Sequence, residues 1–348
     1  RFLGEVIESG SPQTLLLYSD EPLTWLSESQ EYARLWETLL SKVFMSGHKI
    51  KIIHTVNRNI DEMFHAFVKW IPIYCTGAMQ PYYCPKIRDG LFFHTMFIAP
   101  QTAAVTVTTS RVDADNTLNL YHTDKRAIFS LAEEYEGYLG ACKPLMRLFT
   151  PKQAGDFLKL FMEFDMEQRD TASCTQGLSL STLPFSAAST MADRNGIPAF
   201  ADFFRTHEKR LEKQLHSCKM FDIITLPDLE TAKAGKVPVL LPIAGAAELY
   251  YTPAELQSHL GNIIKLLKFH ENYQVTIKSG IEEPYWIYVK EESGVIVSGK
   301  AAPATFFLSE QNMSAAFWDY LQNKTGKDHK PQRERAIRKI EGLIASLD

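Results

Sequence analysis

One histidine, His94, stands near the front of a stretch that has the pattern of a β-hairpin. The stretch LFFHTMFIAPQTAAVTV (91–107) holds two apolar runs separated by a proline and small residues. A histidine can serve as nucleophile, general acid or base, or ligand-binding group, because its ordinary pKa lies near neutrality. It can equally be a core histidine whose ring nitrogens are satisfied by neighbours. Whether the chain is an enzyme depends on which of these roles His94 has.

Further polar side chains follow the runs that are expected to form parallel strands. Because α/β folds bind ligands at the carboxyl ends of such strands, these residues are candidates for a binding site. They are Ser19, Asp20, His54, Asn57 and Arg58 in the first half, and Thr225, Asp228, Lys278 and Ser279 in the second. With His94 and Tyr285 they are expected to line one cleft between the halves. The alternative for each is an ordinary loop residue that meets water.

The composition predicts a globular protein with a large core. The chain has 348 residues, of which 45% are hydrophobic and 22% charged, enough for two domains or two lobes. Its net charge of −4 gives no general attraction to nucleic acid, so any DNA contact needs a local basic patch or a separate module. Neither a secretion signal nor an apolar run near about twenty residues occurs, which predicts a cytoplasmic protein without a membrane span.

The cysteines and the absent motifs narrow the chemistry. The five cysteines, Cys75, Cys84, Cys142, Cys174 and Cys218, form no C-x-x-C pair, so reduced thiols without a metal or cofactor are expected. The loop WIPIYCTGAMQPYYCP (70–85) is either an aromatic lid over a ligand or a cover on the core. A redox pair of Cys75 and Cys84 is not favoured, because nothing nearby lowers a thiol pKa. The chain contains no P-loop, dinucleotide-binding, zinc-protease or nucleophile-elbow motif, which removes several enzyme classes.

The order of expected elements repeats along the chain. The first half runs as strand 14–21, helix 23–47, strand 49–56, helix 60–74, loop 75–90, the hairpin, helix 124–139 and a short helix 143–149. The second half runs as strand 221–228, helix 252–270 with a Thr252/Glu255 capping box, strand 273–280, hairpin 284–299 and helix 309–322. The sequence therefore predicts an α/β fold of two similar lobes, 1–149 and 206–325, with a connecting segment 150–205 and a C-terminal helix 326–348.

Two α/β halves, each with a hairpin after its second strand, resemble the phospholipase D-like fold. That family carries the motif H-x-K-x-x-x-x-D once in each half. On its three positions stand His94, Met96 and Gln101 in the first half, and Tyr285, Ile287 and Glu292 in the second. The resemblance implies two lobes around a pseudo-twofold axis, each a mixed sheet flanked by helices. Since both phosphate-holding lysines are missing, it also implies that phosphodiester chemistry has been lost.

Catalytically inactive domains of this type occur as sensor domains of bacterial transcriptional regulators, behind an N-terminal helix-turn-helix module. Residues 49–100 look similar to the effector regions of such regulators. The resemblance implies a small-molecule effector in the inter-lobe cleft, bound by His94, Tyr285, Arg58, Asn57, His54, Ser19 and Lys278. It implies no cofactor, a homodimer, and DNA binding only through a module before Arg1, where we expect the natural N-terminus to have been removed.

Two other functions remain open at this point. The chain could be a divergent phosphodiesterase or phosphatidyltransferase that uses His94, or a protein-interaction scaffold without a small ligand. The expected dimer surfaces are the charged helix 201–217 and an apolar stripe in the basic tail 327–348. The stripe comprises Ile337, Ile340, Leu343, Ile344 and Leu347. The alternative for the stripe is that it docks on its own domain.

Overall fold

The structure is a computed structural model of the chain. It describes residues 1–21, 30–55, 73–74, 77–84, 91–111, 117–243, 246, 248–280, 285–299, 305–325 and 329–347. The chain divides into two compact units, unit 1 (Arg1–Arg147) and unit 2 (Leu148–Asp348), and each is described by itself. The fold class is mixed α/β, as the sequence predicts, with a seven-stranded sheet in each unit. Most of the predicted helix 60–74 lies outside the described residues.

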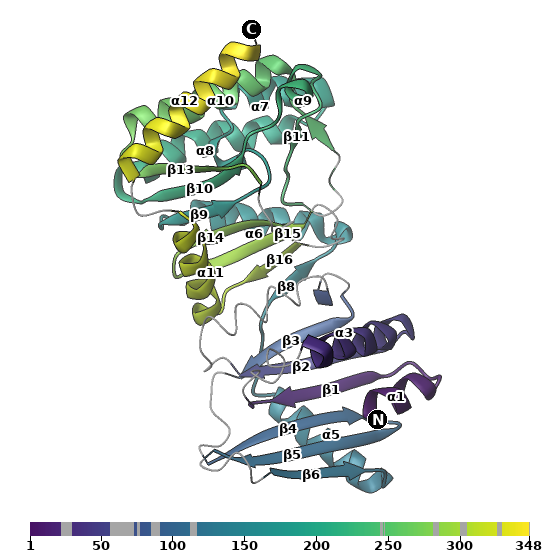
Figure 1. The fold of residues 1–348 in the computed structure, drawn as a ribbon. Coiled ribbons are helices and arrows are strands. Elements are labelled where there is room, and N and C mark those ends of the chain that lie inside the picture. Colours follow the sequence, from purple (N-terminus) through teal and green to yellow (C-terminus); the bar gives the residue numbers. More distant parts are fainter. Residues whose placement is uncertain are drawn as a thin grey trace. The chain divides into compact units, whose positions relative to one another are not determined.

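Unit 1 is built on sheet 1, whose strand order is β6-β5-β4-β1-β2-β3-β7 (Figure 1). Its strands are β1 (Thr14–Ser19), β2 (Lys49–Thr55), β3 (Met79–Cys84), β4 (Phe92–Ala99), β5 (Ala103–Ser110), β6 (Thr117–His122) and β7 (Lys143–Pro144). Its helices are α1 (Phe2–Glu8), α3 (Gln30–Met45) and α5 (Lys125–Leu139). Strands β1, β2 and β3 run parallel, whereas β4, β5 and β6 form an antiparallel meander beside β1.

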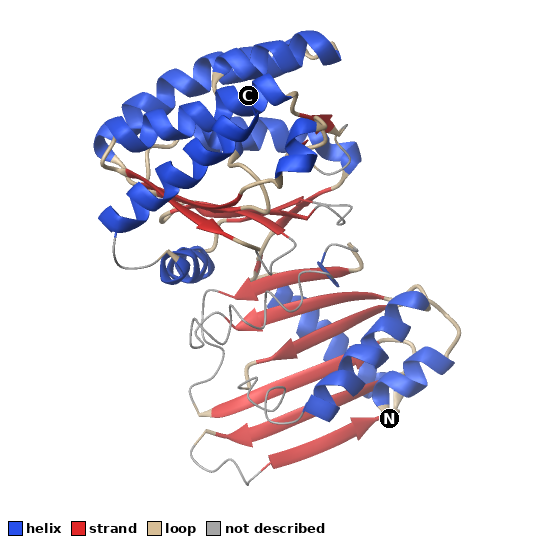
Figure 2. Ribbon diagram, turned by 45° about the horizontal axis from the view of Figure 1, so that its top comes forward, coloured by secondary structure: helices blue, strands red, loops and turns tan. Residues whose placement is uncertain are grey.

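Different helices cover the two faces of sheet 1 (Figure 2). On β4, the Met96 side chain packs in a buried cluster with Ile128 of α5. The next residue, Phe97, contacts the ring of Phe2 in α1 and the ring of Trp36 in α3 at centroid distances of 6.4 and 5.9 Å. Because successive side chains of a strand point to opposite faces, α5 covers one face and α1 with α3 covers the other.

Unit 2 is built on sheet 2, whose strand order is β13-β10-β9-β14-β15-β16-β8. Its strands are β8 (Arg147–Phe149), β9 (Thr171–Cys174), β10 (Met220–Thr225), β13 (Tyr273–Lys278), β14 (Tyr285–Lys290), β15 (Gly294–Gly299) and β16 (Thr305–Leu308). A separate ribbon joins β11 (Pro238–Val239) to β12 (Leu249–Tyr250). The helices are α6 (Ala154–Met166), α7 (Phe185–Asn195), α8 (Pro198–Ser217), α9 (Leu229–Lys233), α10 (Pro253–Phe269), α11 (Gln311–Lys324) and α12 (His329–Leu347).

The two sheets share one arrangement of parallel and antiparallel strands. In sheet 2, β9, β10 and β13 are parallel, and β14, β15 and β16 form the meander. The β4–β5 hairpin ends at the pair Ala99–Ala103, and the β14–β15 hairpin ends at the pair Lys290–Gly294. Six strands therefore follow the same order in the two units, whereas the seventh strand differs, since β7 lies beside β3 and β8 lies beside β16, the counterpart of β6. The pseudo-twofold relation between them stays a prediction.

The central strand of sheet 2 lies where the sequence predicts a connection. The counterpart of β1 is β9, in the segment 150–205, and not the strand predicted at 221–228, which is β10. The predicted connecting segment is thus wrong, since it supplies β9 and the helices α6 and α7 to unit 2. The sequence TASC of β9 is short and has no apolar run or alternation, which are the signals that predict strands.

Two shorter segments, 75–90 and 143–149, also differ from the prediction. The predicted aromatic loop 75–90 contains the strand β3, whose Pro81 and tyrosines do not form an apolar run. The predicted helix 143–149 is instead the pair of short strands β7 and β8. Pro144 within that stretch removes a backbone N–H donor, which disfavours a helix interior and is tolerated at a sheet edge.

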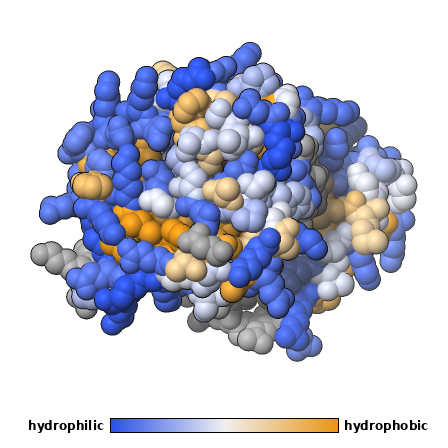
Figure 3. Space-filling model, turned by 90° about the horizontal axis from the view of Figure 1, so that it is seen from above, coloured by the Kyte–Doolittle hydropathy of each residue, from blue (hydrophilic) through white to orange (hydrophobic). Residues whose placement is uncertain are grey.

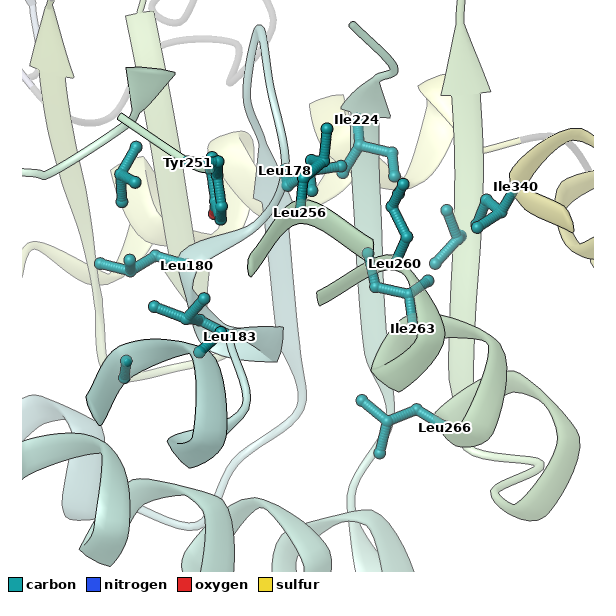
Figure 4. Packing of buried hydrophobic residues seen from close by; sticks show 14 of the residues in the cluster. Leu178, Leu180, Leu183, Ile224, Tyr251, Leu256, Leu260, Ile263, Leu266 and Ile340 are labelled. Carbon is teal, nitrogen blue, oxygen red and sulfur yellow. The ribbon is translucent and has the colours of Figure 1, made fainter. Parts of the chain in front are cut away.

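The C-terminal helix α12 closes the core of unit 2. Ile340 is fully buried among residues that include Leu260 and Ile263 of α10 (Figure 4). The rest of its apolar stripe, Ile337, Leu343, Ile344 and Leu347, packs against the same cluster. On α8, Phe204, Leu211 and Leu215 are buried in this cluster too. The prediction that the apolar stripe of α12 forms a dimer surface is therefore wrong. The surface over α10 and α12 is mainly hydrophilic, with smaller apolar areas (Figure 3).

Candidate functional site

Three of the predicted site residues lie where the parallel strands of sheet 1 end, a region we call the carboxyl edge. The parallel register of β1 and β2 pairs Ser19 with His54. The antiparallel register of β1 and β4 pairs Ser19 with Thr95. The next residues are joined by a 3.1 Å hydrogen bond from the Asp20 amide to the His94 carbonyl. The fold thereby brings Ser19, His54 and His94 to the edge where α/β proteins bind ligands.

The faces of the sheet separate these side chains. The Ser19 hydroxyl lies 2.8 Å from the Thr95 hydroxyl. Ile53, the residue before His54, packs in the cluster under α5. Since successive side chains of a strand point to opposite faces, His54 lies on the face away from α5, together with Ser19 and Thr95. His94 alternates with Thr95 and therefore lies, half-buried, on the α5 face. A ligand bound over the face that carries Ser19 and His54 would contact both residues. His94 lies on the other face, so a ligand beside it would contact a different set of side chains.

A buried carboxylate, that of Asp20, fixes the start of β4. Its side chain is 5% exposed, and its Oδ1 accepts a 2.5 Å hydrogen bond from the His94 backbone amide. Its Oδ2 lies 3.3 Å from Nη2 of Arg111, which follows β5. The Arg111 guanidinium in turn stacks 4.0 Å above the ring of Phe93. This ion pair ties the ends of β1, β4 and β5 together at the carboxyl edge.

Two further contacts extend the polar surface of this edge. The His54 Nε2 atom lies 3.0 Å from the hydroxyl of Tyr74, and burial raises the pKa of that phenol far above its usual value. The Thr109 hydroxyl donates a 2.7 Å hydrogen bond to the Glu21 carboxylate. Tyr74 belongs to the loop 70–85 that was predicted as an aromatic lid or a core cover, whereas Arg111 and Thr109 were not predicted as site residues. For Arg111 and Thr109 a signal was present, because the second strand of a hairpin returns the chain to the edge from which the first strand starts.

The two positions that carry lysine in the phospholipase D-like motif hold buried apolar side chains here. Met96 is 5% exposed and packs with Tyr18 and Ile98 under α5. Ile287, which stands equally far before its hairpin turn, is 1% exposed. At the acid positions, Gln101 donates from its backbone amide to Gln13, and Glu292 pairs with Arg169 at the surface. None of these four side chains can place a cation against a phosphate group.

The remaining predicted site residues lie in unit 2 or outside the described residues. Tyr285 opens β14 opposite Gly299, and Lys278 ends β13 opposite Thr225, where its side chain is exposed. Asn57 and Arg58 fall outside the described residues. The predicted cleft that joins these residues to His94 stays a prediction.

Unit 2 holds a buried polar network that sequence patterns did not predict. The Asp222 carboxylate of β10 accepts hydrogen bonds from the Ser173 hydroxyl at 2.5 Å and from the Tyr273 hydroxyl at 3.0 Å. Burial raises the pKa of Asp222 to about 6 despite these bonds. Nearby, the His259 ring lies between the hydroxyls of Thr182 and Tyr251, each 2.9 Å away. Burial lowers the pKa of His259 to about 3, so the ring is neutral at pH 7.

A second buried network centres on Asp165 at the end of α6. The carboxylate lies 3.0 Å from Nδ1 of His207 and is paired with Arg210. Burial tends to raise the pKa of Asp165, but His207 and Arg210 outweigh burial and hold it below its usual value. Lys290 donates to the backbone carbonyls of Asp165 and Glu167, which caps the end of α6. These groups join α6, α8 and β14, and we assign them a structural role.

No metal or membrane site emerges from the described parts of the chain. Within the described ranges, no three His, Cys, Asp or Glu side chains are grouped so as to hold a metal ion. None of the helices with described residues combines the length and the apolar character needed to span a bilayer. A hollow of about 280 Å³ in unit 1 is lined by Gln13, Lys51 and Glu136 among others, at the opposite end of β1 from Ser19. It is thus separate from the carboxyl edge.

Neither a protein family nor a curated protein is similar enough to this chain to be reported as a relative.

Proposed function

We propose that the chain is the effector-sensing part of a bacterial transcriptional regulator, with a catalytically inactive phospholipase D-like fold. One observation carries the loss of catalysis: Met96 and Ile287 occupy both lysine positions as buried apolar side chains. The shared order of six strands in the two sheets supports the family resemblance. DNA binding would belong to a module that precedes Arg1, and the protein would act in the cytoplasm.

The side chains of the carboxyl edge favour an uncharged, hydroxyl-bearing ligand over a phosphate ester. Among the residues described there, Arg111 supplies positive charge, but Asp20 already balances it. The Glu21 carboxylate adds negative charge, which repels anions. The hydroxyl of Ser19 and the imidazole of His54 can each exchange hydrogen bonds with a ligand hydroxyl. A polyol or monosaccharide suits this set of donors and acceptors best.

A binding screen tests the sensing function. Thermal unfolding is followed with myo-inositol and a panel of monosaccharides, and with inorganic phosphate as the contrasting probe. A true ligand at 100 times its Kd stabilises the protein by about 2.7 kcal/mol. His54→Ala and Ser19→Ala should each weaken binding about tenfold, since each removes about one hydrogen bond to the ligand. His216→Ala, an exposed histidine of unit 2, is the matched control.

Two outcomes contradict this proposal. If a hit binds the His54→Ala and Ser19→Ala proteins as tightly as the wild type, the carboxyl edge is not its site. If phosphate binds and no polyol does, the ligand class is wrong. The rival function, a phosphodiesterase using His94, requires hydrolysis of bis(p-nitrophenyl) phosphate that is lost in His94→Ala. We expect no hydrolysis above the buffer rate.

A homodimer through α6 completes the proposed regulator. With the stripe of α12 buried, α6 offers an exposed apolar row of Leu158, Met162 and Met166, spaced by one helical turn. Lys159 and Glu163 flank its centre, so two copies packed antiparallel would place opposite charges together. Sedimentation of the wild type should show a dimer that Met162→Glu dissociates. A wild-type protein that stays monomeric at high concentration contradicts dimerisation by this part of the regulator.

A further inference from the structure

Two cysteines that lie 58 positions apart in sequence meet at the edge of sheet 1. Strand β7 runs antiparallel to β3, with Tyr82 opposite Pro144 and Tyr83 opposite Lys143. One step further along this register, Cys84 stands opposite Cys142. Neither residue was matched to the other in the sequence analysis, because β7 was predicted as part of a helix.

The backbone hydrogen bonds between β3 and β7 decide whether Cys84 and Cys142 are a hydrogen-bonded or a non-hydrogen-bonded cross-strand pair. The Leu145 amide donates to the Pro81 carbonyl at 2.9 Å, which makes Pro81–Leu145 a hydrogen-bonded pair. Pair types alternate along an antiparallel ladder, so Cys84–Cys142, three steps away, is a pair without backbone hydrogen bonds. The Cα atoms of such pairs are about 4.5 Å apart, inside the range of about 4.4–6.8 Å found for disulfides.

The two cross-strand neighbours carry free thiols in the structure. Both are free cysteines, Cys84 being buried and Cys142 half-buried. The Cys142 Sγ donates to the Tyr138 carbonyl at 3.3 Å, and the Cys84 thiol is close enough to influence the pKa of Cys142. Burial, together with the neighbouring Cys84, raises the pKa of Cys142 to about 12. Because Cys142 is only half-buried, a small oxidant can reach it. Its raised pKa leaves little thiolate near neutral pH, so its reaction is slow there and speeds up as pH rises, because the thiolate is the nucleophile.

We propose that Cys84 and Cys142 are a redox site that closes to a disulfide on exposure to a low-molecular-weight disulfide. In the first step, the Cys142 thiolate attacks one sulfur of oxidised glutathione, forms a mixed disulfide and releases a glutathione thiolate. In the second step, the Cys84 thiolate attacks the Cys142 sulfur and releases the second glutathione thiolate. The two cysteines lose two protons and two electrons in total, and the two electrons reduce the glutathione disulfide.

The cross-link would act on the carboxyl edge of sheet 1. Cys84 ends β3, and the preceding residue Tyr83 pairs with His54 on β2. Cys142 follows the last turn of α5. A disulfide would therefore lock the connection between α5 and β7 to the strand next to His54, and would stabilise unit 1 by closing the loop between the cysteines. The disulfide chemistry does not depend on the proposed function, because it needs no ligand.

Peptide mapping of the full chain tests the proposal. The reduced protein is incubated with oxidised glutathione at pH 8, blocked with N-ethylmaleimide and digested without reductant. We expect a linked peptide pair containing residues 84 and 142, lighter by two hydrogen atoms than the separate peptides and resolved by dithiothreitol. Cys84→Ser and Cys142→Ser should each abolish the link. Cys218→Ser, which removes a buried thiol of unit 2, should leave it unchanged.

Three results would overturn the proposal. One is a fully glutathionylated Cys142 that never resolves to the link. Another is a link from either cysteine to a different partner, such as Cys75. The third is a protein whose two thiols stay reduced until urea is added. Because the wild type alone decides among these results, a serine variant that folds poorly does not obscure the answer. Oxidation should also raise the midpoint of thermal unfolding in the wild type and not in Cys142→Ser.

Discussion

At the end of β1 the neighbouring side chain on β2 is His54, whereas the corresponding position of β10 in unit 2 is Ile224. This equivalence follows from the ladders. Leu16 pairs with Lys51 and Ile98 in sheet 1, and Ala172 pairs with Phe221 and Val289 in sheet 2. Ile98 and Val289 each stand one residue before the end of their hairpin strand. Three residues beyond Leu16 and Ala172 stand Ser19 and Thr175, which therefore correspond to each other. Three residues beyond Lys51 and Phe221 stand His54 and Ile224, which correspond in the same way.

The interiors of the two units also differ in their polar residues. The counterpart of Asp222, a buried carboxylate in unit 2, is Ile52 in unit 1. Ile52 lies on the face of sheet 1 away from α5, because its neighbour Ile53 packs under α5. At the corresponding place unit 2 holds the buried carboxylate of Asp222, and His259 and Asp165 are buried in unit 2 as well. The shared order of six strands therefore supports two different uses of polar residues, and the side chains, not the fold, decide where each unit places its titratable groups.

The largest effect is expected from placing lysine at the two positions that carry it in the phospholipase D-like motif. Met96→Lys and Ile287→Lys each bury an ammonium group in an apolar layer, which should cost about 3–5 kcal/mol of unfolding free energy. Neither variant, nor both together, should hydrolyse bis(p-nitrophenyl) phosphate. His94→Lys, two residues away on the same face but at the edge, is the control and should cost much less. Stable lysine variants that gain diesterase activity would show that both positions face a functional pocket.

Much of the fold was predictable because its signals are local. The hairpins, the helix predicted at 124–139, and α10 with the capping box of Thr252 and Glu255 all match the structure. Ser19, His54 and His94 reach one edge because they follow or begin apolar runs of clear strand character. The small polar sequence of β9 and the two-residue β7 carry no such signal. Their assignment depends on pairing with distant strands, and so the matching of the halves was displaced by one strand and the Cys84–Cys142 pair was missed.

The interior charges of unit 2 give a second test of the comparison. Asp165→Ala removes the acceptor of buried His207 and of Arg210, which leaves polar groups without partners. We expect a loss of about 3 kcal/mol, the size found for breaking a buried ion pair. Asp202→Ala breaks an exposed pair with Arg205 and should cost at most about 1 kcal/mol. Urea unfolding followed by tryptophan fluorescence measures both, and equal losses would contradict a structural role for the Asp165 network.

The opposite pKa shifts of Asp222 and His259 predict a smaller, pH-dependent effect. The folded-state pKa of Asp222, about 6, exceeds the usual 3.8, so this group's contribution to stability is lost as pH rises from 4 to 6. The folded-state pKa of His259, about 3, is below the usual 6.5, so its contribution is complete above pH 6.5 and is lost as pH falls. In the wild type the two slopes oppose each other between pH 4 and 6.

Single variants separate these slopes. Relative to the wild type, Asp222→Asn should gain stability as pH rises from 4 to 6, and His259→Gln should lose it, each by up to about 1.4 kcal/mol per pH unit. The measurement is the urea unfolding free energy at several pH values. An identical pH dependence in all three proteins would mean that these groups titrate alike in the folded and unfolded states.

The smallest effect is expected at Lys51, the residue of unit 1 that corresponds to Phe221 of unit 2. Lys51 Nζ lies 3.0 Å from Glu136 of α5, with the two side chains 30% and 47% exposed. Such a pair is worth at most about 1 kcal/mol, because water screens it and two long side chains must be ordered. Lys51→Phe exchanges the ion pair for the apolar contact that unit 2 makes through Phe221 with Trp318 of α11. We therefore expect the unfolding free energy to change by less than about 1 kcal/mol. Glu136→Gln should lower the unfolding free energy slightly in the wild type and leave it unchanged in the Lys51→Phe background, because the ion pair is then already absent. A loss as large as that of Met96→Lys would show that Lys51 has a role beyond this surface pair, at the hollow that it lines with Gln13.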